Sequence, residues 1–254
     1  MTLNSWYFAA QLAVIACSAA VWCRVAHGKR LGEHFPDGDV IPPPLVGTIV
    51  IFLAFFVGFG GADMREQNRA LRHFAQEEAN QARSVLKFAE GVGPSADQLR
   101  EALIEYLQSA TTVERRWIEG NSNDNAPAQP MVDALVLSAS IFTVQAQSPD
   151  VIKSLLINSV ERLRQARVSR LGASRQFASL PEWLAITVLA LIAQAMIAFV
   201  LVGKPRATTV TVTAFTFAVL SVYVYLAWVD GLIGTSKAAV SVAPLQDVLR
   251  TVTY

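Results

Sequence analysis

Long apolar runs alternate with polar segments along this chain. Four of the runs are long enough to cross about 30 Å of hydrocarbon as α-helices, which rise about 1.5 Å per residue. A lone strand would leave its backbone groups unpaired in lipid, so the fourth run is also predicted to be helical although it is rich in Thr, Val and Tyr. The four predicted spans cover about residues 6–23, 45–62, 183–203 and 208–229.

The polar segment after the second span continues the helical pattern. Composition changes abruptly after Asp63, yet good helix formers persist as far as Glu90, and Gly91–Pro94 then ends the helix. The second span is therefore predicted to continue as a rod for about 40 Å beyond the membrane. Apolar residues at spacings of three and four predict further helices over residues 96–119, 131–147 and 150–171, with a loop over 120–130.

These elements predict an all-α integral membrane protein with four transmembrane helices and a helical domain between the second and third. The expected divisions are a first transmembrane hairpin, a helical domain, a second hairpin and a tail, at residues 1–63, 64–181, 182–230 and 231–254. The first run is not a signal peptide by pattern, because no positive charge precedes it.

Composition supports the membrane assignment. The 254 residues are 53% hydrophobic and only 16% charged, and the mean hydropathy is +0.38, which is too apolar for an ordinary soluble domain. A net charge of +1 gives no reason to expect a nucleic-acid partner. The predicted spans contain no Lys, Arg, Glu or His, which argues against a proton-coupled carrier or a voltage sensor.

The positions of Lys and Arg predict the orientation. The central segment carries most of them, at Arg65, Arg69 and Arg72 near one membrane end and between Arg162 and Arg175 near the other. Positive charge favours the cytoplasmic side, so the central domain and both termini are predicted to be cytoplasmic. Three basic residues between the first two spans pull the other way.

The second span carries a distinctive stripe. Ile51, Phe55 and Phe59 fall within about 80° of one helix face. The same face continues through small or polar positions on both sides, namely Thr48 before it and Ala62, Glu66, Arg69, His73 and Glu77 after it. Apolar rings flanked by polar surface suit a water-filled pathway with a constriction that gates by dewetting. Lipid contact or packing against a neighbouring span explains the same pattern.

The helix predicted over residues 150–171 is strongly basic. Arg162, Arg164, Arg167 and Arg170 alternate with apolar residues along it. A basic helix near a membrane meets either lipid headgroups or carboxylates of a partner, and the pattern leaves both open.

The stretch from Ile51 to Phe59 resembles the neck of bestrophins, a family of pentameric ion channels in which three apolar residues spaced by four line the narrowest part of the pore. Ile51, Phe55, Gly58 and Phe59 match it residue for residue. Glu77 to Asn80, the Leu-rich segment near Leu99 to Tyr106, and Leu180-Pro181 before the third span are similar to bacterial bestrophin-like proteins.

The resemblance implies a homo-oligomeric, pentameric channel in the inner membrane of a bacterium, with chloride or another small anion as the permeant ion. It implies Ile51, Phe55 and Phe59 as the constriction. One departure concerns calcium, because the chain after the fourth span has a single carboxylate, Asp230, where animal bestrophins carry an acidic cluster. Calcium needs six to eight oxygens, so no metal site is predicted, and Asp230 is expected to be a helix-terminal or loop-capping residue.

Enzyme chemistry has no support in the sequence. The three histidines are scattered, no Cys or carboxylate stands with them at metal-ligand spacing, and the glycines near Gly58 lie inside a membrane helix rather than in a phosphate loop. No catalytic residue, cofactor or bound metal is predicted. Two hypotheses remain: an oligomeric ion channel, and a non-conducting membrane scaffold or sensor that acts through its helical domain.

Overall fold

The structure is a computed structural model, and it describes residues 3–27, 42–119, 129–145, 149–175, 180–231 and 236–253. Within those residues every regular element is a helix. The chain divides into two compact units, unit 1 with residues 1–65 and 177–234, and unit 2 with residues 66–176 and 235–254. Helix α3 contributes residues to both units.

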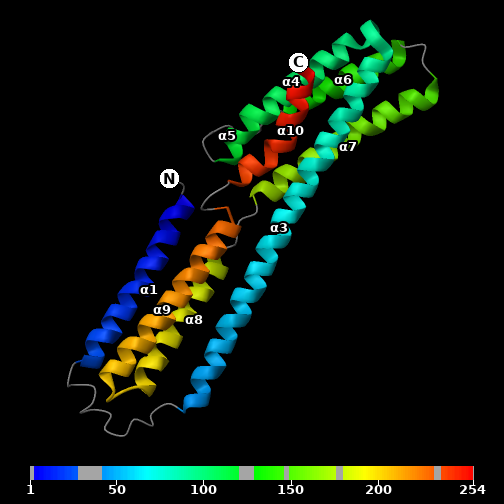
Figure 1. The fold of residues 1–254 in the computed structure, drawn as a ribbon. Coiled ribbons are helices and arrows are strands. Elements are labelled where there is room, and N and C mark those ends of the chain that lie inside the picture. The colour runs from blue at the N-terminus through cyan, green and yellow to red at the C-terminus, as the bar shows by residue number, and fades with distance from the viewer. Residues whose placement is uncertain are drawn as a thin grey trace. The chain divides into compact units, whose positions relative to one another are not determined.

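Among the described residues of unit 1, four long helices are apolar, and Figure 1 shows their course. They are α1 (Leu3–His27), the first part of α3 (Pro43–Val92), α8 (Leu180–Val200) and α9 (Pro205–Val229). Each is long and apolar enough to cross a membrane. The fourth predicted span is thus a helix, as expected for a segment whose backbone must be satisfied within lipid.

The core of unit 1 lies where α1, α8 and α9 pack together, with one face of α3 against them. Buried side chains include Ile15, Leu53, Met64, Ala190, Tyr223 and Leu226. Several polar groups in this core are paired: Gln194 Nε2 donates to Thr216 Oγ1 at 2.9 Å, and the hydroxyls of Thr187 and Tyr223 lie 2.6 Å apart. Pairing offsets the cost of burying these groups, whereas the Oε1 atom of Gln194 has no hydrogen-bond partner among the described residues.

Unit 2 is a bundle of shorter helices around an aliphatic core. The second half of α3 is followed by a 3-10 turn (Gly93–Ala96), α4 (Asp97–Ser109), a π-helical segment η2 (Ala110–Glu114), α5 (Arg115–Ile118), α6 (Gln129–Gln145), α7 (Asp150–Arg175) and α10 (Lys237–Thr253). Buried leucines dominate the core, among them Leu99, Leu103, Leu107, Leu135, Leu156 and Leu245.

Two elements differ from the sequence-based expectation. The residues treated above as a tail form helix α10, whose Leu245 and Val248 are fully buried in the core of unit 2. The helix predicted over residues 96–119 is interrupted by the π-helical segment. A one-residue shift of this kind is a local feature that the spacing of apolar residues does not reveal.

Several predicted connections lie outside the described residues. They include the loop between the first two spans over 28–41, most of the predicted loop 120–130, residues 146–147 at the end of one predicted helix, and residues 232–235 after the fourth span.

Candidate functional site

The predicted neck residues lie exposed along one face of α3 in unit 1. Ile51 is 57% exposed, Phe55 56% and Phe59 72%. The rings of Phe55 and Phe59 stack with their centroids 6.1 Å apart. Helical periodicity explains the exposure, because the same helix turns Leu53 and Met64 into the core of unit 1. The three side chains therefore form a continuous apolar column that nothing in the described chain covers.

Polar and small residues extend this face of α3 toward its N-terminus and past the column. Thr48 is exposed, and its hydroxyl donates to the carbonyl of Pro44 at 3.1 Å, so the helix itself satisfies it. Ala62 is exposed one turn after Phe59. On either side of the column, the helix face therefore carries a small side chain, Ala62, and a hydroxyl that is already hydrogen-bonded, that of Thr48.

In unit 2 the same helix face carries charge. Glu66 and Arg69 form an ion pair at 3.6 Å, with 73% and 77% of their side chains exposed. An exposed pair of this kind contributes little to stability, so both groups remain available to solvent ions. His73 is exposed, and Glu77, which is half-buried, accepts a hydrogen bond from Gln81 Nε2 at 2.8 Å.

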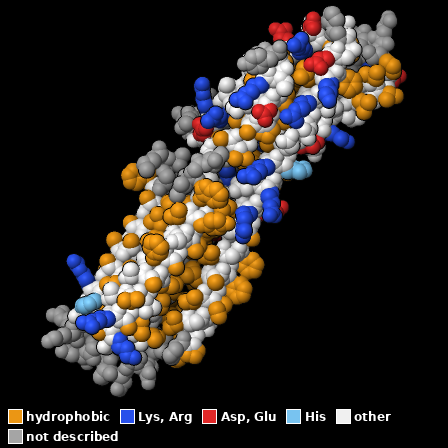
Figure 2. Space-filling model, in the orientation of Figure 1, with side chains coloured by type: hydrophobic (Ala, Val, Ile, Leu, Met, Phe, Trp, Pro, Cys, Tyr) orange, Lys and Arg blue, Asp and Glu red, His pale blue; other side chains and the backbone are white. Residues whose placement is uncertain are grey.

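Figure 2 shows hydrophobic side chains over much of the visible surface of the unit 1 helices. Aromatic residues outside the column add to this surface, and Phe52 and Phe56 are 54% and 49% exposed. An apolar surface of this kind suits contact with lipid or with another membrane helix.

A buried network of charges holds helices α3, α7 and the π-helical segment together in unit 2. Arg170 Nε donates to Glu78 Oε2 at 2.6 Å, and Arg167 Nε donates to Glu114 Oε1 at 2.6 Å. Arg170 also donates to Glu114 and, at 2.9 Å, to the hydroxyl of Ser241 on α10. Two cations and two anions thus balance one another where water is excluded.

Burial controls protonation in this network. Desolvation raises the pKa of Glu78, and the opposing attraction of Arg170 only partly offsets that effect. Desolvation, followed by repulsion from Glu78 and Glu114, raises the pKa of Tyr106 well above its usual value. The Tyr106 hydroxyl therefore stays protonated and donates a hydrogen bond to Glu78. The two carboxylates raise the pKa of Arg170 despite its burial, so it stays charged.

The network settles the environment of two of the four arginines in the basic helix. Arg167 and Arg170 meet carboxylates of the same chain, not lipid headgroups. Arg164, by contrast, is about half exposed and pairs with Glu161 at 3.7 Å.

A periodic signal could have revealed the buried arginines. Along α7, buried residues recur at spacings of four and three. The first three members of this series are apolar and the last three are polar: Leu156, Val160, Leu163, Arg167, Arg170 and Ser174. Glu78 continues a similar series along α3, with Leu71, Ala75, Ala82, Val85 and Ala89. Polar residues that continue an apolar helical stripe are candidates for buried, paired positions.

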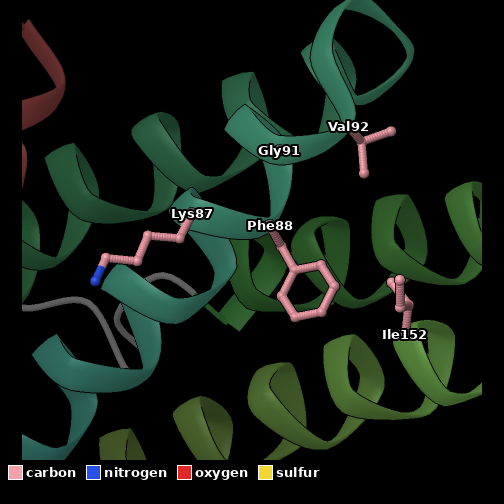
Figure 3. A pocket seen from close by; sticks show the side chains of 5 residues that line it. All are labelled: Lys87, Phe88, Gly91, Val92 and Ile152. Atoms are coloured by element: carbon pink, nitrogen blue, oxygen red, sulfur yellow. The ribbon is translucent and has the colours of Figure 1, made fainter.

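The cavity in unit 2 and the described His, Cys, Asp and Glu side chains give no binding chemistry. A cavity of about 350 Å³ in unit 2 is lined by Phe88, Val92 and Ile152, and the ammonium group of Lys87 points away from these residues (Figure 3). Among the described residues, no group of three or more His, Cys, Asp or Glu side chains could hold a metal ion. Asp230 is buried at the C-terminal end of α9, which is the helix-terminal place expected of it.

Comparison with known proteins identifies the family. The family model described as the bestrophin-like domain matches residues 11–231. The chain therefore belongs to the bestrophin-like family, a family of ion-channel type. The family resemblance noted from the sequence is confirmed over residues 11–231. A comparison of the sequence with curated proteins finds no significant match.

Solved structures share the fold. A mutant of a bacterial bestrophin homologue from Klebsiella pneumoniae is 12% identical, with a TM-score of 0.74 over 97% of this chain and 99% of that one. A crystal structure of that homologue phased with zinc is 11% identical, with a TM-score of 0.70 over 94% and 97% of the two chains. Identities this low show the fold alone, which confirms an all-α, bestrophin-like membrane protein.

Proposed function

We propose that the chain assembles as a homo-oligomer, a pentamer by family resemblance, and conducts small anions such as chloride through a pore lined by α3. Ile51, Phe55 and Phe59 form the hydrophobic constriction in this proposal. Thr48, Ala62, Glu66, Arg69, His73 and Glu77 line the wider parts of the pathway.

The observation that carries the proposal is the exposed column of three apolar side chains, flanked along the same helix face by polar and charged ones. Stacked rings of such side chains around an axis exclude water when they approach closely and admit it when they separate. Glu66, Arg69 and His73 continue the same face beyond the span and would line the cytoplasmic end of the pathway.

The exposure of α3 supports assembly. Only 11% of the most apolar window of α3 is buried within the chain, against 50% of the corresponding window of α8. A four-helix unit of this size has no room for an aqueous lumen, so a pore requires several copies around an axis. In a ring of copies, the face of α3 that carries the column lines the pore, and other exposed parts of the chain contact the neighbouring copies.

The orientation proposed from the positions of Lys and Arg is retained. The termini and the helical unit 2 lie in the cytoplasm, and the spans lie in the bacterial inner membrane. The partners are the lipid bilayer, the permeant ion and further copies of the chain. No enzymatic activity or cofactor is proposed.

Flux through the purified protein in liposomes tests the proposal. Phe55→Ala removes a ring from the column and is expected to raise anion flux. Phe56→Ala removes an equally large and similarly exposed ring from another face of the same helix, and is expected to leave flux near the wild-type value. A monomeric native mass in detergent, or equal effects of the two substitutions, would count against the channel.

One observation favours the scaffold alternative. Unit 2 exposes large apolar side chains on α6 and α7, with Leu137 60%, Val144 84% and Val151 68% exposed. Where such side chains lie close together, they mark an interaction surface. If the protein is silent in flux experiments while folded and oligomeric, a non-conducting scaffold or sensor that binds a partner through this surface becomes the better hypothesis.

A further inference from the structure

In unit 1 a cavity of about 450 Å³ lies between α3 on one side and helices α8 and α9 on the other, and it is open at exposed lining residues such as Ala54 and Ala218. Leu53, Ala54 and Gly58 line its α3 wall, and Phe215, Val219 and Tyr223 line the opposite wall. Its volume falls within the range of sites that hold small ligands. The α3 wall lies on a different helix face from the column of Ile51, Phe55 and Phe59.

The polar chemistry of the cavity is already satisfied within the protein. The Tyr223 hydroxyl is the polar side-chain group among the lining residues, and it is 2.6 Å from the Thr187 hydroxyl and 3.2 Å from the Trp183 carbonyl. A hydroxyl with these partners needs no further hydrogen bond from a ligand. An occupant therefore gains by being apolar along its whole buried length, because a polar group placed here would lose its hydration without compensation.

Small side chains create the space. Ala54 is exposed, and a Cβ added at Gly58 would meet nothing within 4 Å. Further along the helix the fit is close, since a Cβ at Gly61 would lie 3.1 Å from a methyl group of Leu226. Helix α3 therefore packs tightly against α9 at Gly61 and leaves a hollow about one turn earlier. The hollow lies near the middle of the α3 and α9 spans, where the surrounding medium is lipid acyl chain.

We propose that this cavity is a binding site for the acyl chain of a membrane lipid, which supports α3 from behind. Burial of acyl methylenes against Leu53, Phe215 and Val219 supplies the affinity, and the satisfied Tyr223 hydroxyl selects an apolar occupant. A second consequence rests on the proposed function: because the site is on the helix that carries the column, its occupancy sets the position of α3 and thereby the width of the constriction.

Photolabelling of the full-length protein in lipid nanodiscs tests the binding site. The probe is a phosphatidylcholine with a photoreactive group in the middle of one acyl chain, and the labelled residues are found by mass spectrometry. We expect labelling of residues 50–58 and 215–223 that saturates as the fraction of probe rises. Ala54→Phe fills the hollow and is expected to abolish this saturable labelling. Ala16→Phe, at an exposed position of α1 away from the cavity, is the matched control.

Two results would overturn the proposal. Labelling that rises in proportion to the probe and ignores Ala54→Phe would show contact with bulk lipid only. Failure of lipid labelling, together with cross-links from position 54 to another copy of the chain, would show that a neighbouring subunit fills the hollow. Ala218→Phe approaches the same space from α9 and replaces Ala54→Phe if that variant does not keep the wild-type elution profile.

Anion flux through the same variants separates the proposed lipid site from the proposed channel. If Ala54→Phe changes anion flux relative to Ala16→Phe, the cavity controls the position of α3. If the saturable labelling is found but no variant of the column conducts, the proposed channel fails and the lipid site stands.

Discussion

Arg170 on α7 and Glu78 on α3 form a buried ion pair, 2.6 Å from Nε to Oε2, between residues that are 92 positions apart in the sequence. Both side chains are fully buried. Such a pair is costly to desolvate, and it is even more costly to leave half of it without its partner. The pair therefore makes the fold of unit 2 depend on a specific register between α3 and α7.

Removal of Arg170 tests that dependence. Arg170→Ala leaves the Glu78 carboxylate buried without its main cation, and we expect a loss of about 3 to 5 kcal/mol in the free energy of unfolding. The exposed Arg164, which pairs with Glu161 on the surface, is the matched control, and Arg164→Ala is expected to cost about 0.5 kcal/mol or less. Chemical unfolding in detergent measures both, and equal losses would contradict the account.

Tyr106 contributes a separate bond to the network. Its hydroxyl donates to Glu78, and both side chains are fully buried. Tyr106→Phe keeps the ring in the core and removes only the donor, so we expect a loss of about 1.5 to 3 kcal/mol, the usual value for a hydrogen bond to a charged group. A loss below about 0.5 kcal/mol, measured by the same unfolding experiment, would mean that the bond contributes nothing net.

The raised pKa of Glu78 predicts a direction for the pH dependence of stability. Burial makes the folded state hold the Glu78 proton more tightly than the unfolded state does, for which the ordinary value is 4.5. The contribution of that proton to stability is fully present below pH 4.5 and is lost as pH rises through the raised pKa of the folded state.

Glu78→Gln removes this titration and serves as the reference. We expect the stability of the wild type relative to Glu78→Gln to fall as pH rises from about 4 toward neutrality. The measurement is the unfolding free energy of both proteins across that range. A relative stability that rises with pH would show that the attraction of Arg170 outweighs burial.

A substitution at Gly61 tests the close approach of α3 to α9. A Cβ there would lie 3.1 Å from Leu226, whereas a Cβ at Gly60 would meet nothing within 4 Å. Gly61→Val is therefore expected to be less stable than Gly60→Val by about 1 to 3 kcal/mol, the usual cost of overpacking. Because both variants place the same β-branched residue in the helix, the difference in their thermal stability isolates the contact. Equal stability of the two variants would contradict a close contact between α3 and α9 at Gly61.

The sequence reveals the parts of this protein that depend on local periodicity. The four spans follow from the length of apolar runs, and the exposed face of α3 follows from residues three and four apart on one helix. The π-helical segment at Ala110–Glu114 cannot be predicted in this way, because its residue types are the same as those of an ordinary α-helix.

The buried network of charges also cannot be predicted from the local sequence pattern. Glu78, Glu114 and Arg170 come from three separate segments, and only their packing shows that they meet. A charged residue on an amphipathic helix is usually solvated, so residue type alone does not reveal that Arg167 and Arg170 are buried against carboxylates. Their place in the same periodic series as Leu156 and Leu163 was the available signal.

The channel assignment turns on whether the column of Ile51, Phe55 and Phe59 limits ion passage. The direct measurement is chloride flux into liposomes through the wild type and through a variant with all three residues changed to Ala, each checked for oligomeric state. Replacement of chloride by other anions, and then by a sodium salt of an impermeant anion, gives the selectivity. The account predicts that the variant conducts anions faster than the wild type. Folded, oligomeric proteins that are both silent in chloride and in sodium salts would contradict it.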